Sequence, residues 1–294
     1  MRHLLEIDDL DGAEIEAVLD RAEQADPPAV LSGAGMALLF EKPSARTRNS
    51  MEMATVQLGG HPVTIRGDEV GLGTRETPED LARTLGCYHA AIGARVFAHS
   101  TVERMAAAST VPVVCLLSDD AHPLQALADL LTIRQTVGKL EGTTVAYVGD
   151  GNNVCRSLCL AGALTGMTMK VSSPPGHRLS GADLDRIGLV GPPPSSHDRP
   201  AEAVEGADVV YTDVWASMGQ EAEADQRRRA FEGFTVDAAL LDHAPGAVFL
   251  HCLPAHRGEE VSAEVIDGDR SLVWQQAENR MHSARGLLVW MAER

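Results

Sequence analysis

The sequence lacks any long apolar run, and its first residues do not have the pattern expected of a secretory signal. No apolar stretch approaches the ~18 residues that a membrane-spanning helix needs. The first residues, MRHLLEIDDLDG, carry acidic side chains where a secretory signal would have an uncharged core. We therefore expect no membrane partner and a cytoplasmic location.

Cysteine is scarce, and its spacing shows no pairs. The chain of 294 residues contains five cysteines, which are Cys87, Cys115, Cys155, Cys159 and Cys252. An odd set without paired spacings is typical of reduced thiols in a reducing compartment. Disulfide bonds are not expected.

Basic residues are also few relative to acidic residues. Against 42 acidic residues the chain has 25 basic ones, so its formal net charge is −17, which repels nucleic acid and anionic membranes. We therefore expect no nucleic-acid partner, and any tight group of arginines becomes more informative. The run Arg227 to Arg229 is most simply interpreted as a solvated helix face.

The chain does contain short apolar runs that alternate with helical patterns. This alternation predicts an α/β fold with parallel sheets flanked by helices. The runs expected to form strands are MALLF at 36–40, HPVTI at 61–65, AAIGA at 90–94, VPVVCLL at 111–117, TTVAYVG at 143–149, TMKVSS at 168–173, ADVVYTD at 207–213 and GAVFLHC at 246–252.

Two domains are expected. The segment PLQALADLLTIRQTVG has a helical apolar stripe and ends at Gly138, a plausible helix C-cap. We place a first domain at 1–136 and a second at 137–275, with 276–294 as a closing helix. The proline- and glycine-rich stretch 173–200 is expected to be an exposed connection around at most one short helix.

The stretch FEKPSARTRNSMEM, which follows the first apolar run, has the composition of an anion site. If Ser44 caps a helix over 46–58, then free backbone N–H groups, the helix dipole, hydroxyls and Arg46 converge on one point. This is a phosphate cradle. An ordinary N-cap with exposed arginines remains the alternative.

Polar residues follow other strands as well, and ligands of open α/β sheets bind beyond the carboxyl ends of the strands. Arg95 and His122 follow two further strands and can reach the same anion, with Gln125 one helical turn after His122. Taken alone, His122 would more often be structural.

The segment YVGDGNNVCRSL invites a nucleotide-binding interpretation, but a weak one. The third glycine of a dinucleotide fingerprint would fall at Val154, whose branched side chain obstructs close packing. Asn152 and Asn153 can instead offer amides to a carboxylate or an ammonium group. Cys155 and Cys159 lack further metal ligands nearby and are expected to be packed thiols.

The segment HCLPAHRGEE places His251, Cys252 and His256 within six residues, which raises the possibility of zinc. No helix or ribbon with complementary ligand spacing lies nearby. We favour a thiol and exposed carbonyls offered to a polar ligand, and we expect no metal site.

Six segments together resemble one protein family. They are FEKPSARTR, HPLQALADLLTI, GDGNN, DVWASMGQE, HCLPAHRGEEV and AENRMH, spread from residue 40 to 282. In this order they resemble the aspartate/ornithine carbamoyltransferase family, and HCLP with Ser-Met-Gly points to its ornithine-specific branch. The resemblance covers essentially the whole chain.

The resemblance implies a fold, a reaction and an assembly. The fold is a carbamoyl phosphate-binding domain and an ornithine-binding domain, with the last helix packing back on the first. The reaction moves the carbamoyl group of carbamoyl phosphate to the side-chain amine of L-ornithine, which gives L-citrulline and phosphate in arginine biosynthesis. It needs no metal or organic cofactor. The assembly is a homotrimer or a multiple of trimers.

The resemblance also assigns roles to residues. For carbamoyl phosphate they are Ser44, Ala45, Arg46, Thr47, Arg95, His122, Gln125, Cys252, Leu253 and Arg280. For ornithine they are Asn153, Asp213, Ser217 and Met218. The catalytic roles fall to Arg95, His122, Asp213 and Cys252, with the Cys252 thiol near the reacting amine.

One departure from the family pattern leaves alternatives open. Ala45 stands where the family usually has threonine, so one hydroxyl is lost from the cradle. A relative that acts on another amine, such as putrescine or an N-acylornithine, is one alternative. A catalytically silent relative that only binds carbamoyl phosphate is the other.

Overall fold

A computed structural model describes residues 2–216 and 223–294 of the chain. It divides into two compact units, residues 1–131 with 278–294 and residues 132–277. Each unit contains a parallel sheet flanked by helices, which confirms the predicted α/β class. None of the helices described is both long and apolar enough to cross a membrane.

The first unit is built on four parallel strands. They are β1 (Gly35–Phe40), β2 (His61–Arg66), β3 (Ala91–Arg95) and β4 (Val113–Leu117), in the order β2-β1-β3-β4. Each coincides with a predicted apolar run. β1, β3 and β4 are buried almost continuously, because helices cover both faces of the sheet, whereas the edge strand β2 is only partly buried.

Alternate residues of these strands face different helices. Ala37, Leu39 and Ile92 pack with α4 (Pro78–Gly86) and α5 (His99–Ala108). On the other face Met36 receives a hydrogen bond at 3.3 Å from Thr55 of α2 (Ala45–Gln57). The period of two along each strand therefore places helices on both sides. The shorter elements of this unit are η1 (Ile7–Asp9), α1 (Gly12–Ala22) and α3 (Gly67–Val70).

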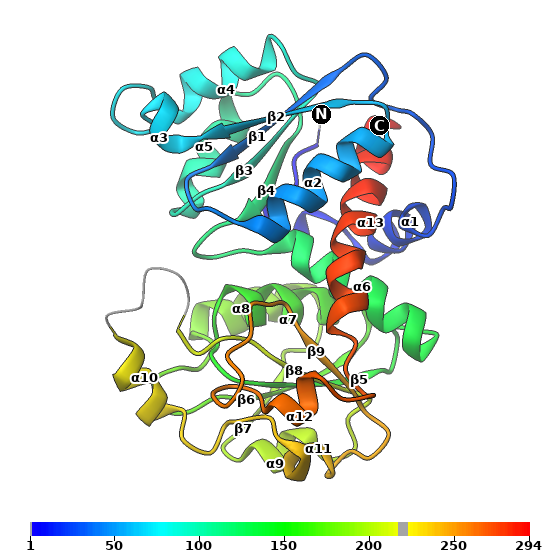
Figure 1. The fold of residues 1–294 in the computed structure, drawn as a ribbon, viewed down its shortest axis with the longest axis vertical. Coiled ribbons are helices and arrows are strands. Elements are labelled where there is room, and N and C mark those ends of the chain that lie inside the picture. Colours follow the sequence, from blue (N-terminus) through cyan, green and yellow to red (C-terminus); the bar gives the residue numbers. More distant parts are fainter. Residues whose placement is uncertain (1, 217–222) are drawn as a thin grey trace. The chain divides into compact units, whose positions relative to one another are not determined.

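The C-terminal helix α13 (Val273–Ala292) packs against the first unit, as predicted (Figure 1). Gly286 lies so close to α1 that a Cβ atom there would be 2.5 Å from the Val18 carbonyl oxygen. Arg285 donates to the Ala22 carbonyl oxygen at 2.9 Å. Glycine is therefore needed at this crossing. The helix α6 (Pro123–Val137) ends at Gly138, which has φ +87° and so confirms the predicted C-cap.

The second unit has five parallel strands. They are β5 (Thr144–Val148), β6 (Thr168–Ser172), β7 (Ser195–His197), β8 (Val209–Thr212) and β9 (Val248–His251), in the order β7-β6-β5-β8-β9. Val210, Phe231 and Phe249 belong to its buried core. Its helices are α7 (Asn153–Thr165), α8 (Gly181–Val190), α9 (Pro200–Val204), α10 (Ala224–Ala230), α11 (Ala238–Leu241) and α12 (Ala263–Ile266).

The stretch 173–200 is more than the exposed connection expected. It contains the ten-residue helix α8 and also the edge strand β7, which the sequence analysis missed. Three polar residues, Ser195 to His197, form this short strand, so no apolar run marks it. Short polar edge strands are common because they resist pairing with other chains.

In both sheets the strand order reverses at one point. In the first unit β1 leads outward to β2, and the chain then returns to β3 on the other side of β1. In the second unit the same reversal separates β5 from β8. Ligands of open α/β sheets bind beyond the strand ends at such points. These points are therefore where each unit should hold its ligand.

Candidate active site

The turn after β1 presents the start of helix α2. Ser44 is the N-cap residue, and its Oγ accepts a hydrogen bond from the Thr47 backbone N–H at 3.2 Å. The predicted cap is therefore confirmed. The first turn of the helix contains no acidic residue, so nothing there competes for the positive end of the helix dipole.

Two buried arginines meet at the Thr47 hydroxyl. Arg95 and Arg280 are 6% and 4% exposed, and they donate to Thr47 Oγ1 at 3.3 and 3.2 Å. Arg95 is the last residue of β3, paired with Phe40 at the end of β1. A hydroxyl has two acceptor lone pairs. Both are used here, so the Thr47 proton is directed elsewhere.

A second contact fixes the orientation of Arg280. Its Nη1 donates to Gln125 Oε1 at 2.6 Å, and the Gln125 amide donates to Asp129 Oδ1 at 2.8 Å. Gln125 and Asp129 lie one turn apart on α6 and are 1% and 0% exposed. A buried network whose members hydrogen-bond one another holds the guanidinium rigidly.

His122 lies in the same positive environment. Burial, followed by the charges of Arg280, Arg95 and Arg46, lowers its pKa well below the ordinary value. The imidazole is therefore neutral at neutral pH and offers a hydrogen-bond donor without a positive charge. The sequence analysis identified the donor, and the structure explains why it is uncharged.

Arg46 completes this group as its most accessible member. Its charge acts on His122, and the described part of the chain provides no hydrogen-bond or ion-pair partner for its guanidinium. With Arg95 and Arg280 it places three guanidinium groups at one edge of the sheet. Like charges held together in a partly buried site disfavour one another, and a bound anion would relieve this repulsion.

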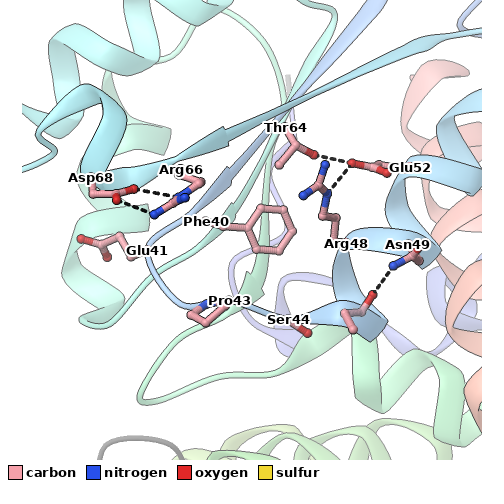
Figure 2. Close-up of a pocket in the computed structure, with 11 residues that line it drawn as sticks. Phe40, Glu41, Pro43, Ser44, Arg48, Asn49, Glu52, Thr64, Arg66 and Asp68 are labelled. Atoms are coloured by element: carbon pink, nitrogen blue, oxygen red, sulfur yellow. Dashed lines mark hydrogen bonds and ion pairs between the residues drawn. The ribbon is translucent and has the colours of Figure 1, made fainter.

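A cavity of about 770 Å³ opens beside the start of α2 (Figure 2). Ser44 and Ala45 line it, and Arg48 donates to Glu52, whose carboxylate also accepts from Thr64 at 2.6 Å. Ala45 is therefore at a ligand-accessible surface. The arginines of this wall, Arg48 and Arg66, pair with the acidic side chains of Glu52 and Asp68.

The second unit brings Asp213 and Cys252 together. Thr212 and His251 pair at the ends of β8 and β9, so the next residue of each strand lies beside the other. The Cys252 Sγ is 3.0 Å from Asp213 Oδ1, which also accepts the Val214 backbone N–H at 2.8 Å. Asp213 is only 5% exposed.

Asn152, which the sequence analysis named as an amide donor but the resemblance did not assign to ornithine, contacts Asp213. Its Oδ1 caps α7 by accepting the N–H groups of Val154 and Cys155, and its Nδ2 donates to Asp213 Oδ2 at 2.9 Å. The asparagine therefore joins the start of α7 to the carboxylate. Its position before a helix was the available signal. Asn153 is the first residue of α7, whereas Ser217 and Met218 lie outside the described residues.

Comparison with known proteins identifies the family. The aspartate/ornithine carbamoyltransferase carbamoyl-P binding domain matches residues 2–135, and the Asp/Orn binding domain of the same family matches residues 141–291. The chain belongs to this family. The resemblance inferred from the six segments is therefore confirmed.

Individual members of this carbamoyltransferase family are similar to the chain over nearly its full length. An ornithine carbamoyltransferase of Parafrankia sp. is 49% identical, covering 99% of this chain and 96% of the relative. The crystal structure of ornithine carbamoyltransferase from Thermus thermophilus has a TM-score of 0.90 at 44% identity, covering 99% of each chain. The ornithine carbamoyltransferase structure from Pyrococcus furiosus has a TM-score of 0.94 at 43% identity, covering 99% of this chain and 97% of that one.

The glycine-rich turn of this carbamoyltransferase chain is shaped for packing. The Gly151 N–H donates to the His177 carbonyl at 2.7 Å, and a Cβ at Gly151 would lie 2.4 Å from the Leu179 backbone nitrogen. Its N–H is thus used within the protein instead of facing a pyrophosphate. This close approach gives the glycine a structural role and argues further against nucleotide binding.

His251 is embedded in protein contacts. Its Nδ1 accepts the Leu253 backbone N–H at 2.8 Å, and its Nε2 is 3.3 Å from Glu260 Oε1. The donor atoms of Asp213, His251 and Cys252 lie within 4.8 Å of one another. A metal bound there would have to displace one of these hydrogen bonds.

Arg227 departs from the solvated helix face expected for 227–229. Its side chain is 11% exposed and its Nη1 donates at 2.8 Å both to Asp150 Oδ2 and to the Trp215 carbonyl. It thereby ties α10 to the turn after β5 and to the segment after β8. Arg228 and Arg229 are exposed, as expected. Only the contacts of the folded chain distinguish the three.

Proposed function

We propose that this chain transfers the carbamoyl group of carbamoyl phosphate to the δ-amine of L-ornithine, producing L-citrulline and phosphate. The observation that carries the proposal is the pair of buried guanidiniums of Arg95 and Arg280 that share the Thr47 hydroxyl. Such a cluster is suited to a small, highly charged anion. Membership of the family supports the same reaction.

We assign the phosphate group to the start of α2. The Ser44 hydroxyl, the Ala45 backbone N–H, Arg46 and Thr47 supply donors, and the helix dipole adds to their effect. Because the Thr47 oxygen already accepts two bonds, its proton is available to a phosphate oxygen. Phosphate charge grows as the leaving group departs, so this cradle stabilises the transition state more than the ground state.

We assign the carbamoyl group to the buried members of the network. Arg95 and the neutral His122 face the carbonyl oxygen, on which negative charge develops. Gln125 and Arg280, with the backbone carbonyls of Cys252 and Leu253, bind the rest of the group. His122 lends a hydrogen bond and no charge, because the surrounding arginines and burial keep its pKa low.

The transfer itself needs little acid–base chemistry from the protein. The lone pair of the neutral δ-amine forms a bond to the carbamoyl carbon, the bond from that carbon to the phosphate oxygen breaks, and the nitrogen loses one proton. Phosphate leaves as a stable anion and can take up that proton. Catalysis is therefore positioning and electrostatic stabilisation by fixed groups.

We assign ornithine to the second unit. Asp213 binds the α-ammonium group, and Asn153 with the 217–218 segment binds the α-carboxylate. Cys252 lies near the δ-amine. The contacts of Asp213 with Asn152 and Cys252 hold its carboxylate in place before the substrate arrives.

We further propose a cytoplasmic enzyme of arginine biosynthesis that assembles as a homotrimer. The five cysteines are all free thiols, which suits a reducing compartment. The loop at 68–80 is the candidate for a segment that contributes groups to the active site of a neighbouring subunit. Sedimentation equilibrium tests the assembly, and a fully active monomer would refute it.

A direct assay tests the reaction. The purified protein is mixed with carbamoyl phosphate and ornithine, and citrulline and phosphate are measured together. Equal amounts of both products are expected. Phosphate release without citrulline would indicate another acceptor or hydrolysis. Binding of carbamoyl phosphate without turnover would identify the silent relative that Ala45 leaves open.

A further inference from the structure

The turn after β9 holds a leucine in a conformation that leucine rarely adopts. Leu253 has φ +59°, and among the described residues it is the one non-glycine residue with positive φ. In this region the Cβ atom crowds the following carbonyl oxygen. Neighbouring contacts must therefore hold the residue there.

His251 provides the first of these contacts. The Leu253 N–H donates to its Nδ1 at 2.8 Å, so Nδ1 must be unprotonated. The ring proton then lies on Nε2, which is 3.3 Å from Glu260 Oε1. The side chains of His251 and Glu260 are both 0% exposed, so this choice of tautomer is shielded from water.

Glu260 closes the turn from its other end. The same oxygen, Oε1, accepts the His256 backbone N–H at 2.5 Å. One buried carboxylate oxygen therefore binds both the His251 ring and the backbone beyond the turn. The His251 backbone N–H donates to Gln276 Oε1 at 2.9 Å. This hydrogen bond holds the backbone that carries the ring.

We propose that His251 and Glu260 are positioning residues that set the backbone of Cys252 and Leu253. This inference rests on the proposed function, in which the carbonyls of those two residues bind the carbamoyl group. Loss of the Nδ1 acceptor releases Leu253 from its positive φ and turns both carbonyls. The Cys252 thiol, 3.0 Å from Asp213, moves with them.

Two substitutions at His251 separate the contacts that its ring makes. In His251→Asn the amide oxygen can still accept the N–H two residues later, while the contact with Glu260 is lost. In His251→Gln the longer amide can reach Glu260, while the Leu253 contact is lost. We expect His251→Gln to lower kcat by roughly 10²-fold, the cost of about 1 Å of misplacement.

His251→Asn should stay within about tenfold of wild-type kcat, since it loses a single hydrogen bond. The KM for ornithine should also rise in His251→Gln, because the thiol that contacts Asp213 moves, and should change little in His251→Asn. Equal activities of the two variants, measured at matched folded fractions, would overturn the proposal, because a merely structural histidine has no reason to prefer asparagine.

Substitutions at Glu260 provide a second test in case the His251 variants do not fold. Glu260→Gln keeps an oxygen that accepts both N–H groups and should retain most of the activity. Glu260→Ala removes both contacts and should lose kcat by a factor similar to that of His251→Gln. Glu259→Ala is the matched control, since it removes the neighbouring carboxylate, which pairs with Arg228. A Glu260→Ala variant as active as that control would contradict the role.

A readout independent of turnover separates this inference from the proposed function. Alkylation of Cys252 by iodoacetamide is followed by peptide mass spectrometry, with exposed Cys87 as the internal reference. The ratio of the two rates should change in His251→Gln and stay near wild type in His251→Asn. An unchanged ratio in His251→Gln overturns the positioning role. A wild-type protein that makes no citrulline refutes only the proposed function.

Discussion

The two candidate ligand sites are built on the same kind of sheet but have opposite chemistry. At the switch point of the first unit, buried guanidiniums of Arg95 and Arg280 meet at one hydroxyl. At the switch point of the second unit, a buried carboxylate, Asp213, accepts from an amide, a thiol and a backbone N–H. The first site gathers positive groups around a hydroxyl, whereas the second surrounds one carboxylate with neutral donors.

Because of this difference, we expect one site to determine the affinity for anions and the other to determine the selectivity among amines. A cluster of positive groups gains most from any small dianion that neutralises it, so the first site should account for anion affinity. In the second site, neutral donors already hydrogen-bond to the Asp213 carboxylate. A ligand therefore binds there only if its own groups replace the hydrogen bonds that it displaces. Selectivity among amines should therefore reside in the second unit.

The largest expected effect follows from that selectivity. Initial rates are compared for ornithine, putrescine, lysine and N-acetylornithine at equal concentrations. Putrescine lacks the α-ammonium and α-carboxylate groups that we assign to Asp213 and Asn153, and it should be slower by up to ~10⁴- to 10⁵-fold, because those partners are left unsatisfied. Lysine keeps the head contacts but misplaces its amine, which costs about 10²-fold.

The acceptor panel also has a clear contrary result. If putrescine or N-acetylornithine reacts faster than ornithine, the assignment of the second unit is wrong. The assignment of the phosphate group would survive, because it depends on Ser44 to Thr47 of the first unit.

The next largest effect is expected from removing one arginine of the charge cluster in the first site. Arg46→Ala removes the charge-assisted contact that we assign to the phosphate and should lower kcat by roughly 10²- to 10³-fold, in the range for loss of one transition-state donor. The melting temperature should not fall, because no described residue pairs with Arg46. Steady-state kinetics and calorimetry measure both. The matched control is Arg83→Ala, an exposed arginine paired with Asp80.

Near-normal turnover of Arg46→Ala with a normal melting curve would show that the cradle does not bind the phosphate. A melting temperature that falls together with activity would instead indicate a structural role for this arginine. The Arg83→Ala control distinguishes either result from a general effect of removing positive charge from an acidic protein.

A smaller effect concerns pH. The folded pKa of His122 is well below its unfolded value near 6.5, so the unfolded chain binds more protons. Stability therefore rises with pH until about 6.5, with a slope of up to ~1.4 kcal/mol per pH unit from this residue. The ligand-free His122→Gln variant should show a flatter dependence between pH 5 and 6.5. Denaturant unfolding at several pH values measures the slope, and an unchanged slope would contradict the shift.

Much of this arrangement was predictable because it depends on strand ends. The apolar runs identified eight of the strands, and the residues after them included Arg95, His122, Asp213 and Cys252. Parallel strands bring such residues to one edge, so the sequence could place them together. The Ser44 cap followed from a local signal of the same kind.

Other features depend on contacts that no local pattern encodes. Arg280 reaches Gln125 across 155 residues of sequence, and only the family resemblance had assigned it to the site. Arg227 lies in a run of three arginines, and only the fold decides which one is buried against Asp150. The edge strand β7 has no apolar signal because it is polar on both sides.

The smallest expected effect concerns the contribution of one hydroxyl at position 45 to carbamoyl phosphate binding. Ala45 lines the cavity beside Ser44 and is exposed at the first position of α2. Ala45→Thr restores the hydroxyl of the usual family pattern, and one neutral hydrogen bond contributes about 1 kcal/mol net. The KM for carbamoyl phosphate should therefore fall about fivefold, with the KM for ornithine unchanged. Ala45→Val is the matched control, since it adds the same bulk without the hydroxyl. If threonine and valine behave alike, bulk is responsible and the hydroxyl makes no contact. If neither changes the KM, the buried arginines already provide all the anion binding that this site needs.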